Sequence, residues 1–166
     1  GWVELPRRVF PSVADAEALL QRAIAHYEYL KSSGAPRAEV RTAEVTIFGA
    51  EECVFLAGAQ QRGEVTALQQ RYTPTEVQVL RVGESGCRAS ISFVGLPGEL
   101  FVEYGLEIKR GGRRGAGRAF VISLANGELQ GYIVTPDAEG YEAAFSLFTP
   151  DAGRVLVEEA LRLIQM

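Results

Sequence analysis

A carboxylate occupies an unusual position in the segment GLPGELFVEYG, residues 95–105. The apolar run over 91–94 is typical of a strand, and the Pro-Gly pair that follows it is typical of a tight turn. This turn leads directly to Glu99, which is followed by another apolar stretch. Two interpretations are open. Glu99 is either a first-turn acid favoured by the dipole of a helix over 99–109, or a carboxylate held at a strand end for chemistry.

Conventional metal ligands are scarce in this chain. Its single histidine, His26, falls on a predicted helix and is interpreted as a partly exposed helix residue. A zinc site built on two or three histidines therefore cannot come from this chain alone. Cys53 and Cys87 match no metal-ligand spacing, and two buried or partly buried thiols are favoured over one disulfide.

The segment KRGGRRGAGR, residues 109–118, is the most basic part of the sequence. Glycine-rich loops with exposed amides can bind anions. This segment, however, lacks the lysine and hydroxyl placement of a phosphate-binding loop and the glycine fingerprint of a dinucleotide site. It is interpreted as a solvated loop between a helix and a strand.

Length and composition predict one globular domain over residues 1–166, with 47% hydrophobic and 23% charged residues. The formal net charge of −4 argues against general nucleic-acid binding, which needs a basic surface. No apolar run is long enough for a transmembrane segment, and the N-terminus has no signal-peptide pattern. The first residue is glycine, which favours a truncated or processed chain.

Two helices are predicted in the first third of the sequence. The first has Ser12 as N-cap, Asp15 in a variant capping box and Gly34 as its stop, with a buried apolar stripe between them. The second follows Pro36, and its apolar spacing continues to residue 57. A break over 46–50 is the alternative, because Gly49 and the strand-like VTIF lie there. Residues 59–76 are interpreted as a connection.

From residue 76 the periodicity changes to strands. Two strands, over 76–83 and 87–96, flank a hairpin-type loop, and a helix follows over 99–109. The near-continuous apolar run over 119–125 is typical of an interior strand, and a terminal helix ends the chain. The prediction is an α/β fold with a mixed β-sheet packed against helices. A helical part over 12–60 precedes an α/β part over 76–166.

Several segments together resemble one enzyme family. The segments LPGELFVEYGLEIKR, AFVISLANGELQGYIVT and GYEAAFS are similar, in order and spacing, to the neutral/alkaline non-lysosomal ceramidases and their shorter bacterial relatives. The match extends from about residue 76 to the C-terminus, and the upstream helices resemble the helical stretch before this region. The resemblance therefore covers the C-terminal portion of the family's catalytic domain.

The resemblance implies a zinc-dependent amidase that hydrolyses an N-acyl linkage, as in ceramide. The family holds its metal with two histidines, a glutamate and a tyrosine. The glutamate of the Pro-Gly-Glu block falls on Glu99, and the tyrosine of the Tyr-Ile-x-Thr block falls on Tyr132. These two are the expected metal ligands. The supporting residues around them are expected to be Pro97, Gly98, Asn126, Tyr141 and Glu142.

This chain departs from the family pattern in its histidines, which lie upstream of this region in the family and have no equivalent here. One extra residue also separates Asn126 from Tyr132. The first hypothesis is therefore a ceramidase-like C-terminal portion that is inactive alone. It would be completed by the N-terminal part of the catalytic domain and would act on an N-acyl or sphingolipid-like substrate. The alternative is a stand-alone non-catalytic binding or scaffold domain. A weaker third hypothesis pairs Glu99 with Glu103 or Glu107 on one helix face as an acid/base pair.

Overall fold

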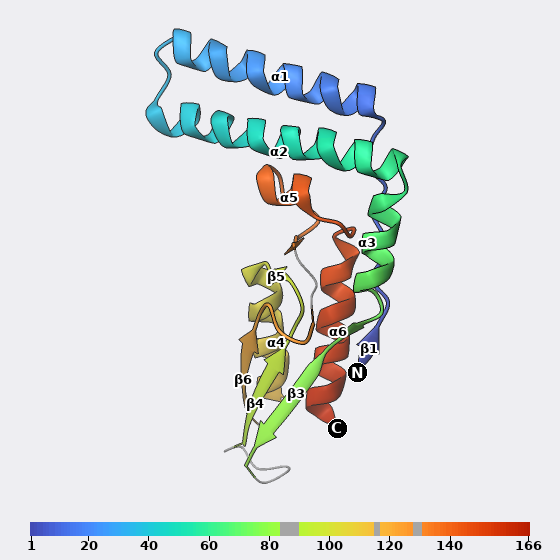
Figure 1. The fold of residues 1–166 in the computed structure, drawn as a ribbon. Helices are drawn as coiled ribbons and strands as arrows, with labels where there is room; N and C mark the ends of the chain where they lie inside the picture. The colour runs from blue at the N-terminus through green and yellow to red at the C-terminus, as the bar shows by residue number, and fades with distance from the viewer. Residues whose placement is uncertain (84–89, 115–116, 128–130) are drawn as a thin grey trace. The chain divides into compact units, whose positions relative to one another are not determined.

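The computed structural model describes residues 1–83, 90–114, 117–127 and 131–166. In these residues it contains six helices and seven strands, which confirms the predicted α/β fold (Figure 1). The chain divides into two compact units. The α/β unit comprises Gly1–Arg7, Gln69–Pro136 and Leu147–Met166, and the helical unit comprises Arg8–Leu68 and Asp137–Ser146. The interpretation of residues 1–166 as one domain stays a prediction.

The helical unit is built on a pair of long helices, α1 (Val13–Ser32) and α2 (Arg37–Gln61). The predicted ends of α1 are confirmed. Ser12 Oγ accepts a hydrogen bond from the Asp15 amide at 3.1 Å and donates one to the Asp15 carboxylate at 2.6 Å. Gly34 follows the helix with a φ of +70°, a conformation that glycine adopts without steric cost.

Three details of the helical unit differ from the predictions. The helix α2 is continuous, and the predicted connection over 59–76 contains α3 (Glu64–Tyr72), which extends into the α/β unit. Of the predicted apolar stripe of α1, only Ala16 is fully buried. Helix α1 packs chiefly on α2, and the other residues of the stripe are half-buried or exposed. Gly49 does not break α2. A Cβ there would lie 3.1 Å from the Cα of Tyr141 on the short helix α5 (Tyr141–Phe145), so glycine permits this close packing.

A half-buried arginine, Arg8, ties the start of the helical unit to α5. Arg8 Nη1 donates to the carbonyl oxygens of Ala143, Ala144 and Ser146, at the end of α5 where carbonyls lack helical partners. Burial lowers the pKa of the Arg8 guanidinium, and an electrostatic interaction with Cys53 opposes that shift. Burial likewise raises the pKa of the Cys53 thiol. Cys53 is a free buried cysteine, as expected, and Cys87 lies outside the described residues.

The α/β unit contains a mixed three-stranded sheet in the order β3 (Gln78–Val82), β4 (Ser90–Gly95), β6 (Gly117–Ile122). β3 and β4 are antiparallel, whereas β4 and β6 are parallel. The apolar run that predicted an interior strand forms β6, which lies at an edge of this sheet, so that prediction is wrong. Two short pairs complete the strands: β1 (Trp2–Val3) with β2 (Thr75–Glu76), and β5 (Glu99–Leu100) with β7 (Tyr132–Ile133).

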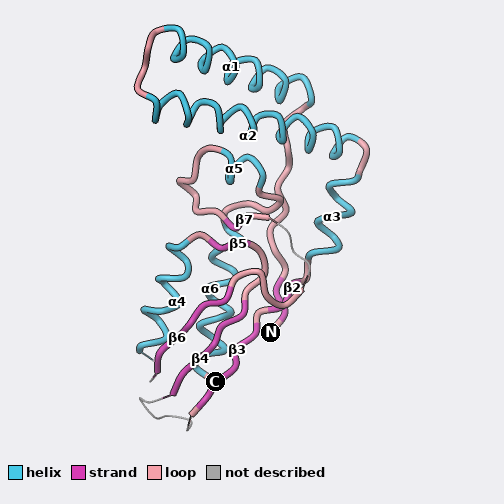
Figure 2. Tube along the Cα trace, turned by 60° about the vertical axis from the view of Figure 1, so that its left-hand side comes forward, coloured by secondary structure: helices cyan, strands magenta, loops and turns pink. Residues whose placement is uncertain are grey.

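Two helices, α4 (Val102–Arg114) and α6 (Asp151–Gln165), lie side by side on one face of the three-stranded sheet (Figure 2). Glycines allow this close packing. A Cβ at Gly111 would lie 2.3 Å from Leu161 of α6, and one at Gly112 would lie 2.9 Å from the Cβ of Ala119. The basic segment is therefore helical through Arg114, which corrects the predicted loop over 109–118; residues 115–116 lie outside the described residues.

Tyr104 joins three parts of the α/β unit. Its ring is buried, and its hydroxyl lies 3.0 Å from the carbonyl oxygen of Val134 after β7 and 3.0 Å from that of Pro150 before α6. The ring lies directly on the backbone of α6, because a Cβ at Gly153 would be 2.1 Å from its Cζ. A phenol anchored at its tip cannot move away from such an added methyl group without losing these contacts.

We therefore expect Gly153→Ala to lower the free energy of unfolding by about 2–3 kcal/mol, the cost of overpacking a well-filled core. The matched control is Gly105→Ala in α4, where an added Cβ meets no atom within 4 Å. That change should raise stability by up to about 1 kcal/mol through helix propensity. Urea denaturation of both variants measures the difference, and equal midpoints would contradict the packing described.

Candidate functional site

Glu99 and Tyr132, the two expected metal ligands, lie directly opposite each other on neighbouring strands. β5 and β7 are parallel, with Glu99 in register with Tyr132 and Leu100 with Ile133. Paired positions of adjacent strands project from the same face of a sheet, and successive positions alternate. Ile133 is buried and Glu99 is exposed, so the carboxylate and the phenol belong to the outward face of this pair.

The turn before Glu99 fixes the position of its strand. Pro97 is fully buried, and Gly98 has a φ of +68°, which a residue with a side chain adopts only at a cost. The carbonyl of Gly98 accepts a hydrogen bond from the Leu124 amide at 2.9 Å, and the Glu99 amide donates to Gly131 O at 2.9 Å. Glu99 is thus a strand residue, and its interpretation as the first-turn acid of a helix is wrong, because α4 begins at Val102.

Asn126 supports the end of β4 from the neighbouring turn. Its Nδ2 donates to the carbonyl oxygen of Gly95 at 2.7 Å, and its own φ is +59°, a conformation that asparagine tolerates better than most residues. The side chain occupies the space above Gly95, since a Cβ there would lie 2.8 Å from Asn126 Nδ2. Gly127 follows with a φ of +130°. These contacts join the β4 and β6 ends beside the turn that carries Glu99.

Tyr141 and Glu142, the other expected supporting residues, belong to the helical unit. They begin α5, which packs on α2, and the Tyr141 ring lies 5.9 Å from the Phe145 ring. Glu99 and Tyr132 belong to the α/β unit. The structure therefore gathers Pro97, Gly98 and Asn126 around the Glu99 turn within one unit, and it assigns Tyr141 and Glu142 to the other.

The Glu99–Tyr132 pair offers two oxygen donors, a carboxylate and a phenol. A catalytic zinc site takes three protein ligands plus water. Within the described ranges no group of three His, Cys, Asp or Glu residues is close enough to hold a metal ion. His26 belongs to the helical unit, where it is exposed and lines an open hollow of about 370 Å³ with Glu39.

The proposed acid pair of the third hypothesis is not supported. Glu103 and Glu107 are exposed residues of α4, whereas Glu99 lies on β5 before the helix begins. The three carboxylates therefore do not share one helix face. Glu103 is the acidic residue in the first turn of α4, where the helix dipole favours it.

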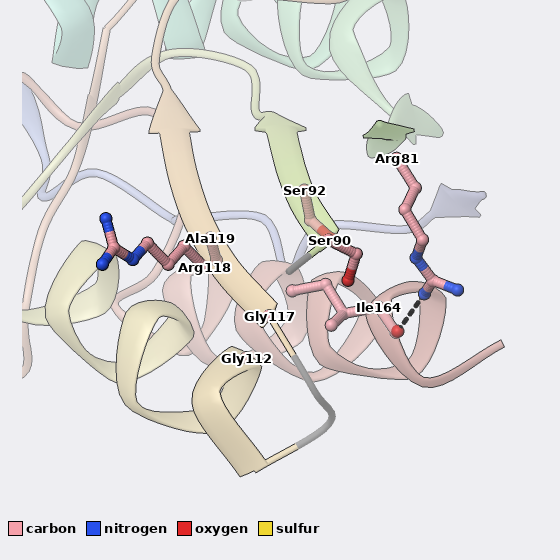
Figure 3. A pocket seen from close by; sticks show the side chains of 8 residues that line it. All are labelled: Arg81, Ser90, Ser92, Gly112, Gly117, Arg118, Ala119 and Ile164. Carbon is pink, nitrogen blue, oxygen red and sulfur yellow. Dashed lines mark hydrogen bonds between the residues drawn. The ribbon is translucent and has the colours of Figure 1, made fainter. Parts of the chain in front are cut away.

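A small cavity under the sheet is not a ligand site. It lies between the strands and the two helices, has a volume of about 10 Å³ and has room for one water molecule at most (Figure 3). Arg81 of β3 borders it and donates a hydrogen bond to the carbonyl oxygen of Ile164 near the end of α6. A cation is favourable at a helix C-terminus, so this arginine has a structural role.

Comparisons with protein-family models, curated proteins and solved structures return no match. Among the described residues, no helix has the length and apolar character needed to cross a membrane.

The Asn126 turn provides a test of how the site is supported. Asn126→Gly keeps the left-handed backbone and removes the hydrogen bond to Gly95, so it should lower the free energy of unfolding by about 1 kcal/mol. Asn126→Ala also adds the cost of a left-handed alanine and should lower it by about 2–3 kcal/mol. Thermal and urea unfolding of both variants test this order. A glycine variant less stable than the alanine variant would contradict it.

Proposed function

We propose that this chain is the C-terminal portion of a ceramidase-like zinc amidohydrolase and supplies two ligands, Glu99 and Tyr132, to its metal. The observation that carries the proposal is the register of β5 and β7, which sets these two residues side by side. They were selected from separate sequence blocks 33 positions apart, by resemblance alone. Their position opposite each other on one strand pair is what supports the proposal.

The position of the pair suits a metal site. The turns that carry Glu99 and Asn126 follow the carboxyl ends of the parallel strands β4 and β6, the edge at which α/β proteins commonly bind ligands. The turn residues are fixed by burial of Pro97, by the positive φ of Gly98 and by the Asn126 hydrogen bond. Rigid support of this kind is what a metal ligand needs in order to keep its geometry.

A zinc ion held there supplies Lewis-acid activation of water for attack on an amide carbonyl. The role of this chain is to provide the anionic carboxylate and the phenol oxygen and to hold both at fixed spacing. Two oxygen donors do not complete a catalytic zinc site. In this proposal the remaining ligands, two histidines by resemblance, come from the N-terminal part of the catalytic domain. The isolated chain is then inactive toward an N-acyl sphingolipid-like substrate.

The alternative is a non-catalytic binding or scaffold domain. No group of three metal-ligating residues is present in the part of the chain that the structure describes. A domain that kept the fold and lost the chemistry would keep the β5–β7 pair without binding zinc. Zinc affinity at the pair therefore separates the two proposals.

The test is a calorimetric zinc titration of the 166-residue chain, with phenolate formation followed by ultraviolet absorption. We expect a Kd on the order of 0.1–1 mM, because two ligands supply only part of the binding free energy of a complete site. Zinc should also produce a phenolate signal, since the metal charge favours the ionised phenol. Glu99→Gln and Tyr132→Phe should each weaken binding at least about tenfold, and Tyr132→Phe should abolish the signal.

Matched controls distinguish the pair from surface binding. Glu103→Gln removes an exposed acid of α4, and Tyr29→Phe removes an exposed tyrosine of α1. Neither should alter zinc binding. No binding at millimolar zinc, or binding that is unaffected by the Glu99 and Tyr132 changes, would favour the scaffold alternative. Amide hydrolysis by the isolated chain would contradict the half-site.

A further inference from the structure

One face of the three-stranded sheet is apolar and largely exposed. Its residues alternate with those under α4 and α6, and in the described residues no element of the α/β unit packs on it. We call this the outer face. Its apolar side chains are Leu80, Val82, Ile91, Phe93, Phe120 and Ile122, and Gln78, Gly95 and Arg118 share it by register. Four of its members are strongly exposed: Leu80 at 61%, Val82 at 54%, Phe120 at 46% and Ile122 at 49%.

The outer face is one contiguous patch. The register places Leu80, Phe93 and Phe120 in a row across all three strands, and the Phe93 and Phe120 ring centroids are 5.7 Å apart. In the next row of the same face, Val82 of β3 lies opposite Ile91 of β4. The patch presents on the order of 500 Å² of apolar surface, at the upper end of what monomeric proteins expose. Such a patch indicates an interaction surface.

The sequence of β6 indicates that both faces of the sheet are covered. Alternating polar and apolar residues are typical of a sheet with one solvated face, whereas continuous apolar runs are typical of strands buried on both faces. Residues 119–122 are Ala, Phe, Val and Ile, yet helices cover only the face that includes Ala119. The composition of β6 therefore suits a second layer on the outer face.

We propose that a second copy of this chain covers the outer face, in a symmetric dimer with the two sheets packed face to face. Two such faces would bury about 1,000 Å² in total, the threshold for specific association. A pleated sheet face packs well on another at about 10 Å. Among the described strand residues, no acidic side chain lies on the outer face. Its one charged residue, Arg118, is exposed at a corner of the sheet in register with Ile91 and Val82, so in the dimer it lies over the partner's Val82 at the edge of the interface.

In the proposed dimer, the two-fold axis is parallel to β4. It superposes β6 of one copy on β3 of its partner, so that Phe120 faces Leu80 of the other copy and the two Phe93 residues meet at the axis. Each Phe120 ring then meets an aliphatic side chain, Leu80 of the other copy, in both halves of the interface, and the two Phe93 rings meet each other. The proposed dimer does not involve zinc, so its test is independent of the test of the metal site.

Sedimentation velocity of the 166-residue chain in a chelator tests the dimer over a range of concentrations. We expect a reversible monomer–dimer equilibrium with a Kd in the micromolar range, given the modest area. Phe120→Asp and Leu80→Lys should each weaken dimerisation at least about tenfold, because each buries a charge against an apolar partner. A mixture of the two variants should dimerise more strongly than either alone, since Asp and Lys then meet across the interface.

The control is Val102→Asp, which alters a residue that is 66% exposed on α4, the helix layer behind the sheet. It should leave the equilibrium unchanged, and circular dichroism checks that all variants stay folded. A wild-type chain that is monomeric at every concentration would overturn the proposal. So would a dimer that survives both outer-face changes, or a monomer that sediments with phosphatidylcholine vesicles in a Phe120-dependent manner.

Discussion

Parallel pairing of β4 with β6 is the interaction on which the rest of the α/β unit depends. Parallel neighbours cannot be joined by a hairpin, so the chain needs a crossover, and α4 lies on that crossover. The crossover brings both carboxyl ends to one edge of the sheet. Backbone hydrogen bonds continue there from Leu96 to Ile122 and from Ala125 to Leu96, each at 2.9 Å. The turns that carry Glu99 and Asn126 are held together by this extension.

Close packing of helices is the second constraint, and it explains most of the glycines that interrupt helical segments. Gly111 and Gly112 let α4 approach Leu161 and Ala119, and Gly153 accepts the ring of Tyr104. The Tyr104 hydroxyl in turn bonds the segment after β7 and the start of α6. Tyr104 thereby connects β7, which carries Tyr132, to the helix layer. Tyr104 itself has no role in the proposed chemistry.

Local sequence signals predicted many of the elements, and they failed where long-range packing decides the outcome. The caps of α1 follow from Ser12, Asp15 and Gly34, whose side chains and backbone act within one turn. The glycines of residues 109–118 predicted a loop, because their intrinsic propensity is against helix. Contacts with α6, some fifty residues away in sequence, outweigh that propensity and keep the segment helical. Similarly, the composition of β6 predicted an interior position, whereas β6 lies at an edge of the three-stranded sheet.

By itself, the sequence determined the α/β class, the two N-terminal helices and the turn before Glu99. These depend on periodicity, turn chemistry and residue type, which are local properties. Only the tertiary structure decided that Glu99 is a strand residue opposite Tyr132, and that Tyr141 and Glu142 belong to the other compact unit. Strand register joins residues far apart in the chain, and no local pattern encodes which two-residue strand pairs with which.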